Sequence, residues 1–407
     1  MATDTASPAP EPDRLNRRQI WVLTLASAVV TANAYYIHPI IALVADDFQV
    51  SSSTIGLVPA LNQIALALGI LLLLPLGDRF SNRTLTAIFV FGQFAAMTLM
   101  AFSRDFYLFV LGSTLLGFMT IAPYLLPTYA SKRVDPKELG KVTAILTTGI
   151  IAGILCARAG AGVIAEYFGW RMVYYVATAL MLIVAILLPL NMDRREQTAD
   201  ETNQTSYAQL ILSMFSVARR YPEILLSGVI QALNFGIFIS IWLGLGLHLT
   251  SPEMGFGVDV VGYLALFAVI NLFTAPRFGA WADRVGARKS RAILAGFQLC
   301  GVMLFVFLGW NLWLLMIPIV ITNTFGPVID VTTRMTFLNE AANVRTRLMT
   351  IYVVFMFVGG GVSSWAGTSA YDVWGWTGNA LLALGMSLIV LCLCLLAYFL
   401  ARKKTAA

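Results

Sequence analysis

The chain has 407 residues, of which 58% are hydrophobic and only 12% are Asp, Glu, Lys or Arg, and its formal net charge is +6. A soluble domain carries about 25% charged residues. The composition therefore argues against a water-soluble protein and predicts a chain that lies mostly within a membrane.

The chain begins with MATDTASPAPEPD, a Pro- and Ala-rich stretch without periodicity that predicts disorder, and we assign residues 1–19 to a tail. Apolar blocks of roughly 18 to 25 residues follow, each long enough to cross about 30 Å of hydrocarbon as a helix. Gly and Pro interrupt the blocks and the alternation of barrel strands is absent, so we expect an all-α membrane protein. The twelve expected helices lie at 20–44, 55–76, 84–102, 107–130, 142–165, 172–191, 222–248, 259–280, 292–309, 312–337, 349–370 and 379–401.

The positions of basic residues predict the orientation of these helices. With the N-terminus in the cytoplasm, most of the 27 Lys and Arg fall in cytoplasmic loops, and only Arg104 and Arg171 fall in outer loops. This asymmetry is what the positive-inside rule describes, and it places both termini in the cytoplasm of a cell that we expect to be bacterial. The basic pI therefore indicates topology, and we expect no nucleic-acid partner.

Two stretches of the chain indicate an internal repeat. LLPLGDRFSNRT follows the second expected helix and FGAWADRVGARK follows the eighth, and Gly169-Trp170 has a counterpart in Gly375-Trp376 at nearly the same offset. We therefore predict an N-terminal six-helix bundle over 20–191, a cytoplasmic linker over 192–221, a C-terminal six-helix bundle over 222–401 and a tail over 402–407. Two repeated bundles can expose a substrate held between them to each side of the membrane in turn, which is the architecture of a secondary transporter.

The two loops carry the residues of a known signature. The chain resembles the major facilitator superfamily over its whole twelve-helix length, and it is most similar to the drug:proton antiporter branch of bacterial exporters. The second loop fits the signature fully and the first fits it in part, with Leu74 and Ser81 in place of its two glycines. The matching residues are Gly279, Asp283, Arg284, Gly286, Arg288 and Lys289 in the second loop, and Asp78, Arg79 and Arg83 in the first.

The resemblance implies that these loops form a cytoplasmic latch that favours the outward-open state. Asp78 would then bind near the start of the eleventh helix and Asp283 near the start of the fifth, where exposed N–H groups attract a carboxylate. The alternative is that these charges only set the topology. The chain also departs from the family, because Ser113 stands where proton-linked members often carry Arg and Ile154 stands where antiporters carry Pro.

A few ionisable residues fall within or at the ends of the apolar helices, where they are costly and candidates for function. Arg158 could hold an anionic substrate group or pair with a titrating acid, or it could be structural. Asp330 and Arg334 lie one turn apart and predict a pair, with a role in proton coupling or in structure and gating. His38 and His248 lie near the outer ends of the first and seventh helices, where each could titrate or serve as a hydrogen-bonded interface residue.

The family also implies that the first, fourth, seventh and tenth helices line the substrate cavity. Polar and aromatic residues of these helices describe an aromatic, mostly neutral pocket suited to amphipathic or uncharged solutes. The candidates are Asn33, Tyr35, Tyr36, Tyr124, Gln231, Asn234, Trp242 and Asn323. The four cysteines all lie in apolar blocks, so we expect neither a metal site nor a cofactor.

The sequence leaves three functions open. The first is proton-coupled efflux of small organic molecules, the second is import or facilitated passage of a sugar or organic acid, and the third is a non-transporting membrane sensor. No HExxH, GxSxG or phosphate-binding loop is present, so we expect no enzyme. We expect a monomer in the inner membrane whose partners are a small-molecule substrate, protons and lipid.

Overall fold

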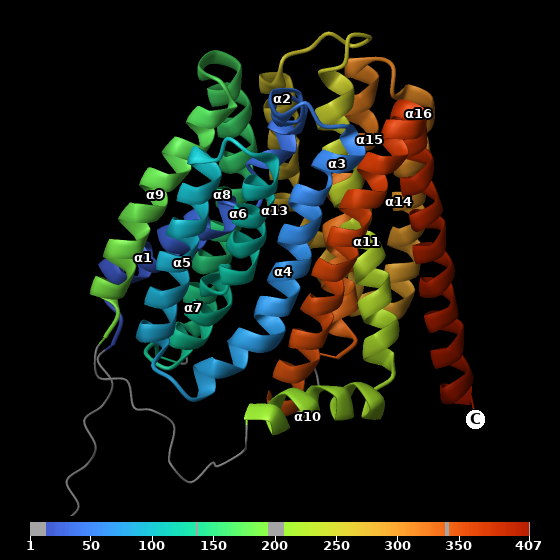
Figure 1. The fold of residues 1–407 in the computed structure, drawn as a ribbon. Coiled ribbons are helices and arrows are strands. Elements are labelled where there is room, and N and C mark those ends of the chain that lie inside the picture. Colours follow the sequence, from blue (N-terminus) through green and yellow to red (C-terminus); the bar gives the residue numbers. More distant parts are fainter. Residues whose placement is uncertain (1–13, 136, 194–206, 338–341, 407) are drawn as a thin grey trace, which may run out of the picture.

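The computed structural model describes residues 14–135, 137–193, 207–337 and 342–406, and every regular element within these ranges is a helix (Figure 1). The stretch MATDTASPAPEPD and residues 194–206 of the expected linker lie outside the described residues. The longer helices before the linker are α1 Arg17–Ala32, α2 Ile37–Phe48, α4 Leu57–Leu73, α5 Asn82–Phe102, α6 Phe106–Met119, α7 Ala122–Ser131, α8 Leu139–Phe168 and α9 Trp170–Asn191. The helices after it are α10 Tyr207–Arg220, α11 Glu223–Leu249, α12 Val258–Ala265, α13 Ile270–Val285, α14 Ala287–Leu308, α15 Leu312–Met335 and α16 Ala342–Ala406. Short elements are α3 Ser52–Ile55, η1 Leu74–Asp78 and η2 Leu266–Val269.

The described residues contain eleven helical segments that are long and apolar enough to cross a membrane. The eleventh and twelfth expected helices merge in this count because both belong to α16, whose apolar span covers Val344–Arg402. Gly375 interrupts α16 with φ 59° and ψ −152°, a conformation that glycine adopts without the steric cost of a side chain. In Figure 1 the chain of α16 rises, reverses near the upper end of the molecule and descends to the C-terminus.

Two other expected helices are each divided into two near candidate site residues. The first expected helix separates into α1 and α2 at a turn that contains Tyr35, and the fourth separates into α6 and α7 at Thr120. The α10 helix occupies the second part of the expected linker. These divisions bring side chains at the breaks into positions that a continuous helix would not give them.

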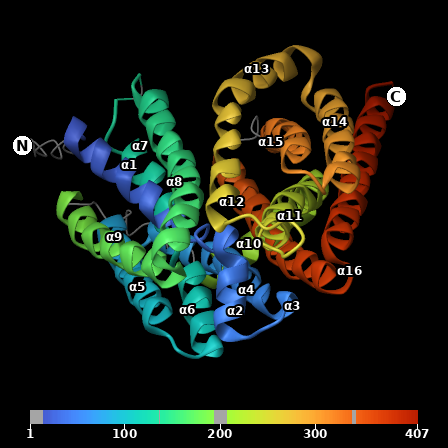
Figure 2. The ribbon, with the colours of Figure 1, turned by 90° about the horizontal axis from the view of Figure 1, so that it is seen from above.

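Glycines in the two parts of the chain have similar packing roles. A Cβ atom at Gly153 of α8 would collide with the backbone of Ala28 in α1, and one at Gly359 of α16 would collide with the backbone of Ala232 in α11. Both glycines therefore permit close approach of two long helices. Seen from above, the helices up to α9 lie together on one side and α11–α16 lie together on the other (Figure 2).

Several helices of the two groups pack on each other toward the upper end of Figure 1. There α2 packs on α11, α8 packs on α12, and α3 and α4 pack on α16. The backbone N–H of Val258 donates to Glu166 Oε2 at 3.0 Å, and the Ser53 hydroxyl donates to Asp372 Oδ2 at 2.9 Å. At the lower end, α10 connects the groups, because the Tyr207 hydroxyl donates to the carbonyl oxygen of Leu72 at 2.5 Å and Met214 is buried against α16.

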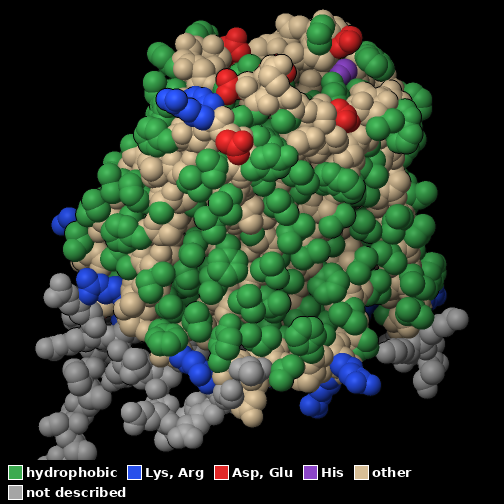
Figure 3. All heavy atoms as spheres, in the orientation of Figure 1, with side chains coloured by type: hydrophobic (Ala, Val, Ile, Leu, Met, Phe, Trp, Pro, Cys, Tyr) green, Lys and Arg blue, Asp and Glu red, His purple; other side chains and the backbone are tan. Residues whose placement is uncertain are grey.

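The surface is apolar around its middle and charged at its two ends. Figure 3 shows hydrophobic side chains over most of this face, with several Lys and Arg along the lower margin and Asp and Glu near the upper margin. The chain therefore presents to its surroundings the apolar band that a bilayer requires.

Candidate functional site

A cavity of about 310 Å³ lies where the two groups of helices meet. This volume is at the lower end of the range for small-molecule sites, which is about 300–1,000 Å³. The lining comes from α1 and the turn after it, α4, the α6–α7 break, α7, α8, α11, α15 and α16. The lining residues are Thr31, Ala34, Tyr35, Gln63, Leu66, Thr120, Pro123, Tyr124, Ile150, Ile154, Phe235, Asp330, Arg334, Met356 and Phe357.

Two of the eight predicted cavity residues, Tyr35 and Tyr124, line this cavity, and the other six lie outside its lining. Asn33, Tyr36 and Asn323 are buried. Asn234 donates to Gln231 Oε1 at 3.1 Å and to the carbonyl oxygen of Gly326 at 3.0 Å, so its amide is used between helices of the C-terminal group. Trp242 contacts Arg158 instead.

The lining also contains residues that the cavity prediction did not include. Phe235, Phe357 and Tyr124 form an edge-to-face aromatic cluster across α11, α16 and α7, with centroid distances of 5.7 and 6.4 Å. Nothing in the sequence singles out these phenylalanines among 25, because only the packing of three distant segments brings them to one surface. Gln63, a polar residue within the apolar α4, also lines the cavity.

The predicted pair of Asp330 and Arg334 is present at the cavity wall. Arg334 Nε donates to Asp330 Oδ1 at 3.0 Å, and Arg334 Nη2 lies 2.8 Å from Asp330 Oδ2. The Tyr352 hydroxyl also donates to Asp330 Oδ1 at 2.5 Å. The carboxylate therefore has a cation and a neutral donor as partners before any solute enters.

Arg158 and His38 were predicted as separate candidates, and the structure brings them together. Arg158 is only 1% exposed, and its Nη2 donates to His38 Nδ1 at 3.0 Å. Its Cζ atom lies 5.2 Å from the ring centroid of Tyr35, 4.6 Å from that of Phe238 and 4.7 Å from that of Trp242. Among the described residues, no carboxylate lies within ion-pair distance of this guanidinium.

His248 has a different environment from His38. Its Nε2 donates to the carbonyl oxygen of Gly309 at 2.9 Å, and its ring stacks on Trp376 at 4.8 Å with an interplanar angle of 15°. These contacts match the alternative of a hydrogen-bonded histidine at a helix interface.

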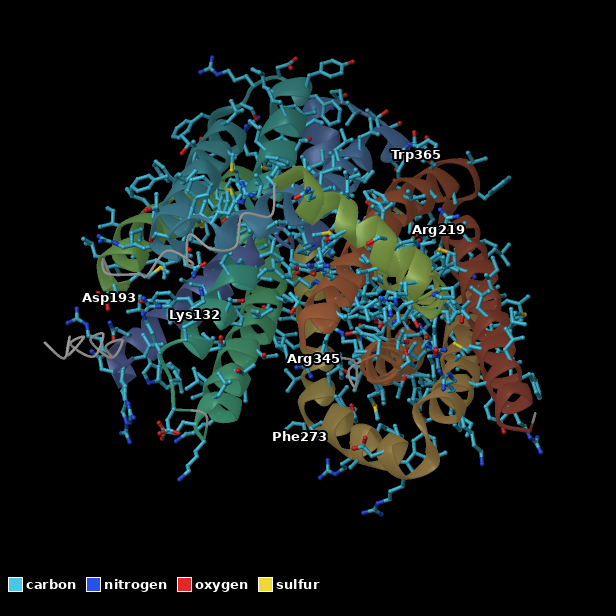
Figure 4. The ribbon with its side chains drawn as sticks, turned by 90° about the horizontal axis from the view of Figure 1, so that it is seen from below. Lys132, Asp193, Arg219, Phe273, Arg345 and Trp365 are labelled. Carbon is cyan, nitrogen blue, oxygen red and sulfur yellow. The ribbon has the colours of Figure 1, made fainter. Side chains whose placement is uncertain are left out.

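The predicted latch residues lie in or next to η1, at the start of α5, and around the α13–α14 junction. Figure 4 shows the molecule from below, with Lys132, Arg219 and Arg345 among the labelled residues. Gly286 has φ 96°, which accounts for glycine at this position of the signature. Arg288 contacts both carboxylate oxygens of Glu223 at 2.6 Å, a pair within the C-terminal group that the sequence did not suggest.

Of the two contacts predicted for the latch, the one between Asp283 and the start of α8 is not formed among the described residues. Asp283, Arg284 and Lys289 are exposed, and no hydrogen bond or ion pair joins Asp283 to α8 in the described part of the chain. Arg83 Nε donates to the carbonyl oxygen of Pro189 at 2.8 Å, Arg79 is exposed, and the side chain of Asp78 lies outside the description. The latch therefore stays a prediction about another conformation.

The family profile of the Major Facilitator Superfamily matches residues 23–364, which is most of the chain. The chain belongs to this family. The superfamily consists of transporters, so the protein is a multi-pass membrane transporter.

Individual relatives agree with this assignment. The chain is 27% identical over 377 residues to the uncharacterized transporter YgaY of Escherichia coli O157:H7, covering 91% of this chain and 93% of the relative. It is 26% identical over 252 residues to the multidrug resistance protein MdtG of Citrobacter koseri, covering 59% of each chain. The fold is similar to that of the nucleoside transporter NupG, with a TM-score of 0.72, 14% identity, and coverage of 93% of this chain and 99% of that one.

Proposed function

We propose that this protein exports small organic molecules in exchange for protons by alternating access. The observation that carries the proposal is a cavity whose wall is built by both groups of helices, so that a relative movement of the groups would change its access. In this proposal the upper face of Figure 1 is the outer face, the lower face and both termini are cytoplasmic, and the membrane is the bacterial inner membrane. The protein works as a monomer.

The proposal includes twelve crossings in two six-helix bundles, over 20–191 and 222–401. The apolar span of α16 has 59 residues, and a straight helix of that length would measure roughly 90 Å, about three times the thickness of the hydrocarbon. Its break at Gly375 supports two crossings joined by an outer turn. Residues 192–221, including α10, form the connection between the bundles.

The present conformation supports an inward-facing state. The close contacts and the hydrogen bonds of Glu166 and Ser53 join the two groups at the upper face. Glycine contributes to this closure, because a Cβ atom at Gly246 of α11 would collide with the carbonyl oxygen of His38 in α2. Asp283 and Asp78 would form their latch contacts only after the lower face closes, which is why they would stabilise the outward-open state.

Export and proton coupling have separate support. The relative MdtG is a multidrug resistance protein, which favours export of organic molecules. Asp330 is the acidic residue of the cavity wall. Its protonation would break the ion pair with Arg334 and allow the side chains of the wall to move. Import or facilitated passage of a sugar or organic acid is the alternative, since Ser113 replaces the fourth-helix Arg of proton-linked relatives.

The test uses the full chain in liposomes that contain a pH-sensitive dye and a panel of lipophilic cations, organic acids and sugars. We expect a solute-dependent proton flux that Asp330→Asn abolishes, whereas Glu253→Gln, which changes a carboxylate outside the cavity lining, leaves it unchanged. Solute flux without proton movement in the unmodified protein would refute coupling and favour a facilitator. Absence of flux for every solute would contradict transport of these classes.

A further inference from the structure

The two arginines nearest the cavity differ in one respect that suggests the charge of the substrate. Arg334 is neutralised by Asp330, whereas Arg158 has no carboxylate within ion-pair distance among the described residues. A buried cation without a counter-charge is unfavourable and is commonly retained for a function. Arg158, Arg334 and Asp330 together thus carry one positive charge in excess, because the carboxylate of Asp330 neutralises only Arg334.

The unpartnered hydrogen-bonding groups of Arg158 and His38 are donors. A guanidinium has no acceptor atom, so Arg158 Nη2 must donate to His38 Nδ1, and the neutral His38 ring then carries its proton on Nε2. His38 Nε2 and Arg158 Nε are both buried without a hydrogen-bond partner. Two orphaned N–H donors beside a positive charge fit a group that only accepts hydrogen bonds, such as a carboxylate.

The aromatic rings around Arg158 hold the cation without neutralising it. Phe238 and Trp242 belong to α11, Tyr35 lies in the turn between α1 and α2, and Arg158 itself lies on α8. Cation–π contacts stabilise a guanidinium in an apolar site but leave its charge available to an anion. The site also spans both groups of helices, so a ligand bound there would respond to their relative movement.

This cluster adjoins the cavity directly. Tyr35 contributes to both, since it lines the cavity and its ring faces Arg158. Ile154 and Phe235 also line the cavity, and they precede Arg158 and Phe238 by about one helical turn on α8 and α11. Rotation of the Tyr35 side chain, or withdrawal of α11, would join Arg158 to the cavity.

We propose that Arg158 and His38 form an anion-binding subsite that takes the carboxylate of an amphipathic organic monoanion, whose apolar body lies against Phe235, Tyr124 and Phe357 in the cavity. One negative charge on the substrate balances the excess positive charge of the site. This amends the expectation of a mostly neutral pocket for uncharged solutes. The inference rests on the proposed transport function, because it names the substrate class of the same cavity.

The test measures binding, which does not depend on transport. Purified full-length protein in detergent is titrated with benzoate, 3-phenylpropionate and decanoate, and with the corresponding uncharged amides, while its thermal unfolding is followed. We expect one or more carboxylates to raise the Tm in a saturable manner and the matching amides to have no effect. Equal effects of carboxylates and amides, or no effect of any carboxylate, would overturn the proposal.

Variants assign the effect to the subsite. Arg158→Gln is expected to weaken carboxylate binding at least about tenfold, because the bound charge loses its partner. Arg277→Gln is the matched control, since Arg277 is exposed and donates to the Phe273 carbonyl of its own helix. Arg158→Met also removes the charge and provides a second variant if Arg158→Gln does not fold. Undiminished carboxylate binding in the folded Arg158 variant would place the anion elsewhere and overturn the assignment.

Two further outcomes separate this inference from the transport proposal. Stabilisation by chloride or nitrate at the same concentrations as by carboxylates would overturn the organic substrate class. Flux of cations or sugars in liposomes without any carboxylate binding would refute the subsite and leave the transporter intact. Carboxylate binding that depends on Arg158, without flux of any solute, would support the subsite and contradict the transport proposal.

Discussion

Arg334 and Arg158 are two arginines near one cavity, and they are stabilised in different ways. Arg334 has a carboxylate one helical turn away and a tyrosine that shares this carboxylate. Arg158 has a histidine nitrogen and three aromatic rings, drawn from three segments of the chain. The ion pair within α15 thus neutralises the charge of Arg334. The aromatic rings around Arg158 stabilise its guanidinium but leave its charge free to bind an anion.

The largest effect should come from breaking the local pair. Asp330→Ala leaves Arg334 without a counter-charge, and breaking a buried pair is strongly destabilising; with the side chains 32% and 22% exposed, we expect a loss of roughly 2 kcal/mol. This loss is measured as the difference in the free energy of unfolding between the variant and the unmodified protein in detergent. The double variant Asp330→Ala/Arg334→Ala should recover part of the loss because it removes both charges. A double variant less stable than the single one would show that the pair is not the cause.

A smaller effect of opposite sign is expected at Arg158. Arg158→Met removes a buried charge that has no carboxylate partner and keeps an apolar side chain among the three rings, so the ligand-free protein should become more stable by about 1 kcal/mol. The same unfolding measurement, made without added organic anions, tests this. Destabilisation equal to that of Asp330→Ala would mean that Arg158 is structural.

The smallest effect concerns the hydrogen bond between Glu166 and Val258, which joins the two groups of helices at the upper face. At the lower face, the predicted latch contact of Asp283 is not formed among the described residues. Glu166→Ala removes the acceptor of the Val258 N–H, a hydrogen bond worth about 1 kcal/mol, so amides at the start of α12 should exchange with deuterium roughly fivefold faster. Mass spectrometry of peptides from this region measures the rate. Glu166→Gln keeps an acceptor oxygen and serves as the control. Unchanged exchange in Glu166→Ala would show that this contact does not help to close the upper face.

Much of the fold could be predicted because it depends on local chemistry. The apolar blocks give the spans to within a few residues, and the spacing of Asp330 and Arg334 gives their pairing, since residues four apart share one face of a helix. The lining of the cavity depends on more than local chemistry. Six of its eight proposed residues lie outside the lining, because the rotation of each helix about its axis depends on its neighbours and not on its own sequence.

Composition, periodicity and short motifs predicted the membrane class, the apolar helices and the family. Which polar groups meet depends instead on tertiary packing. His38 and Arg158 lie 120 residues apart, and Trp242 comes from the other group of helices, yet they form one site. No local pattern records such contacts, because they depend on how α2, α8 and α11 pack against one another.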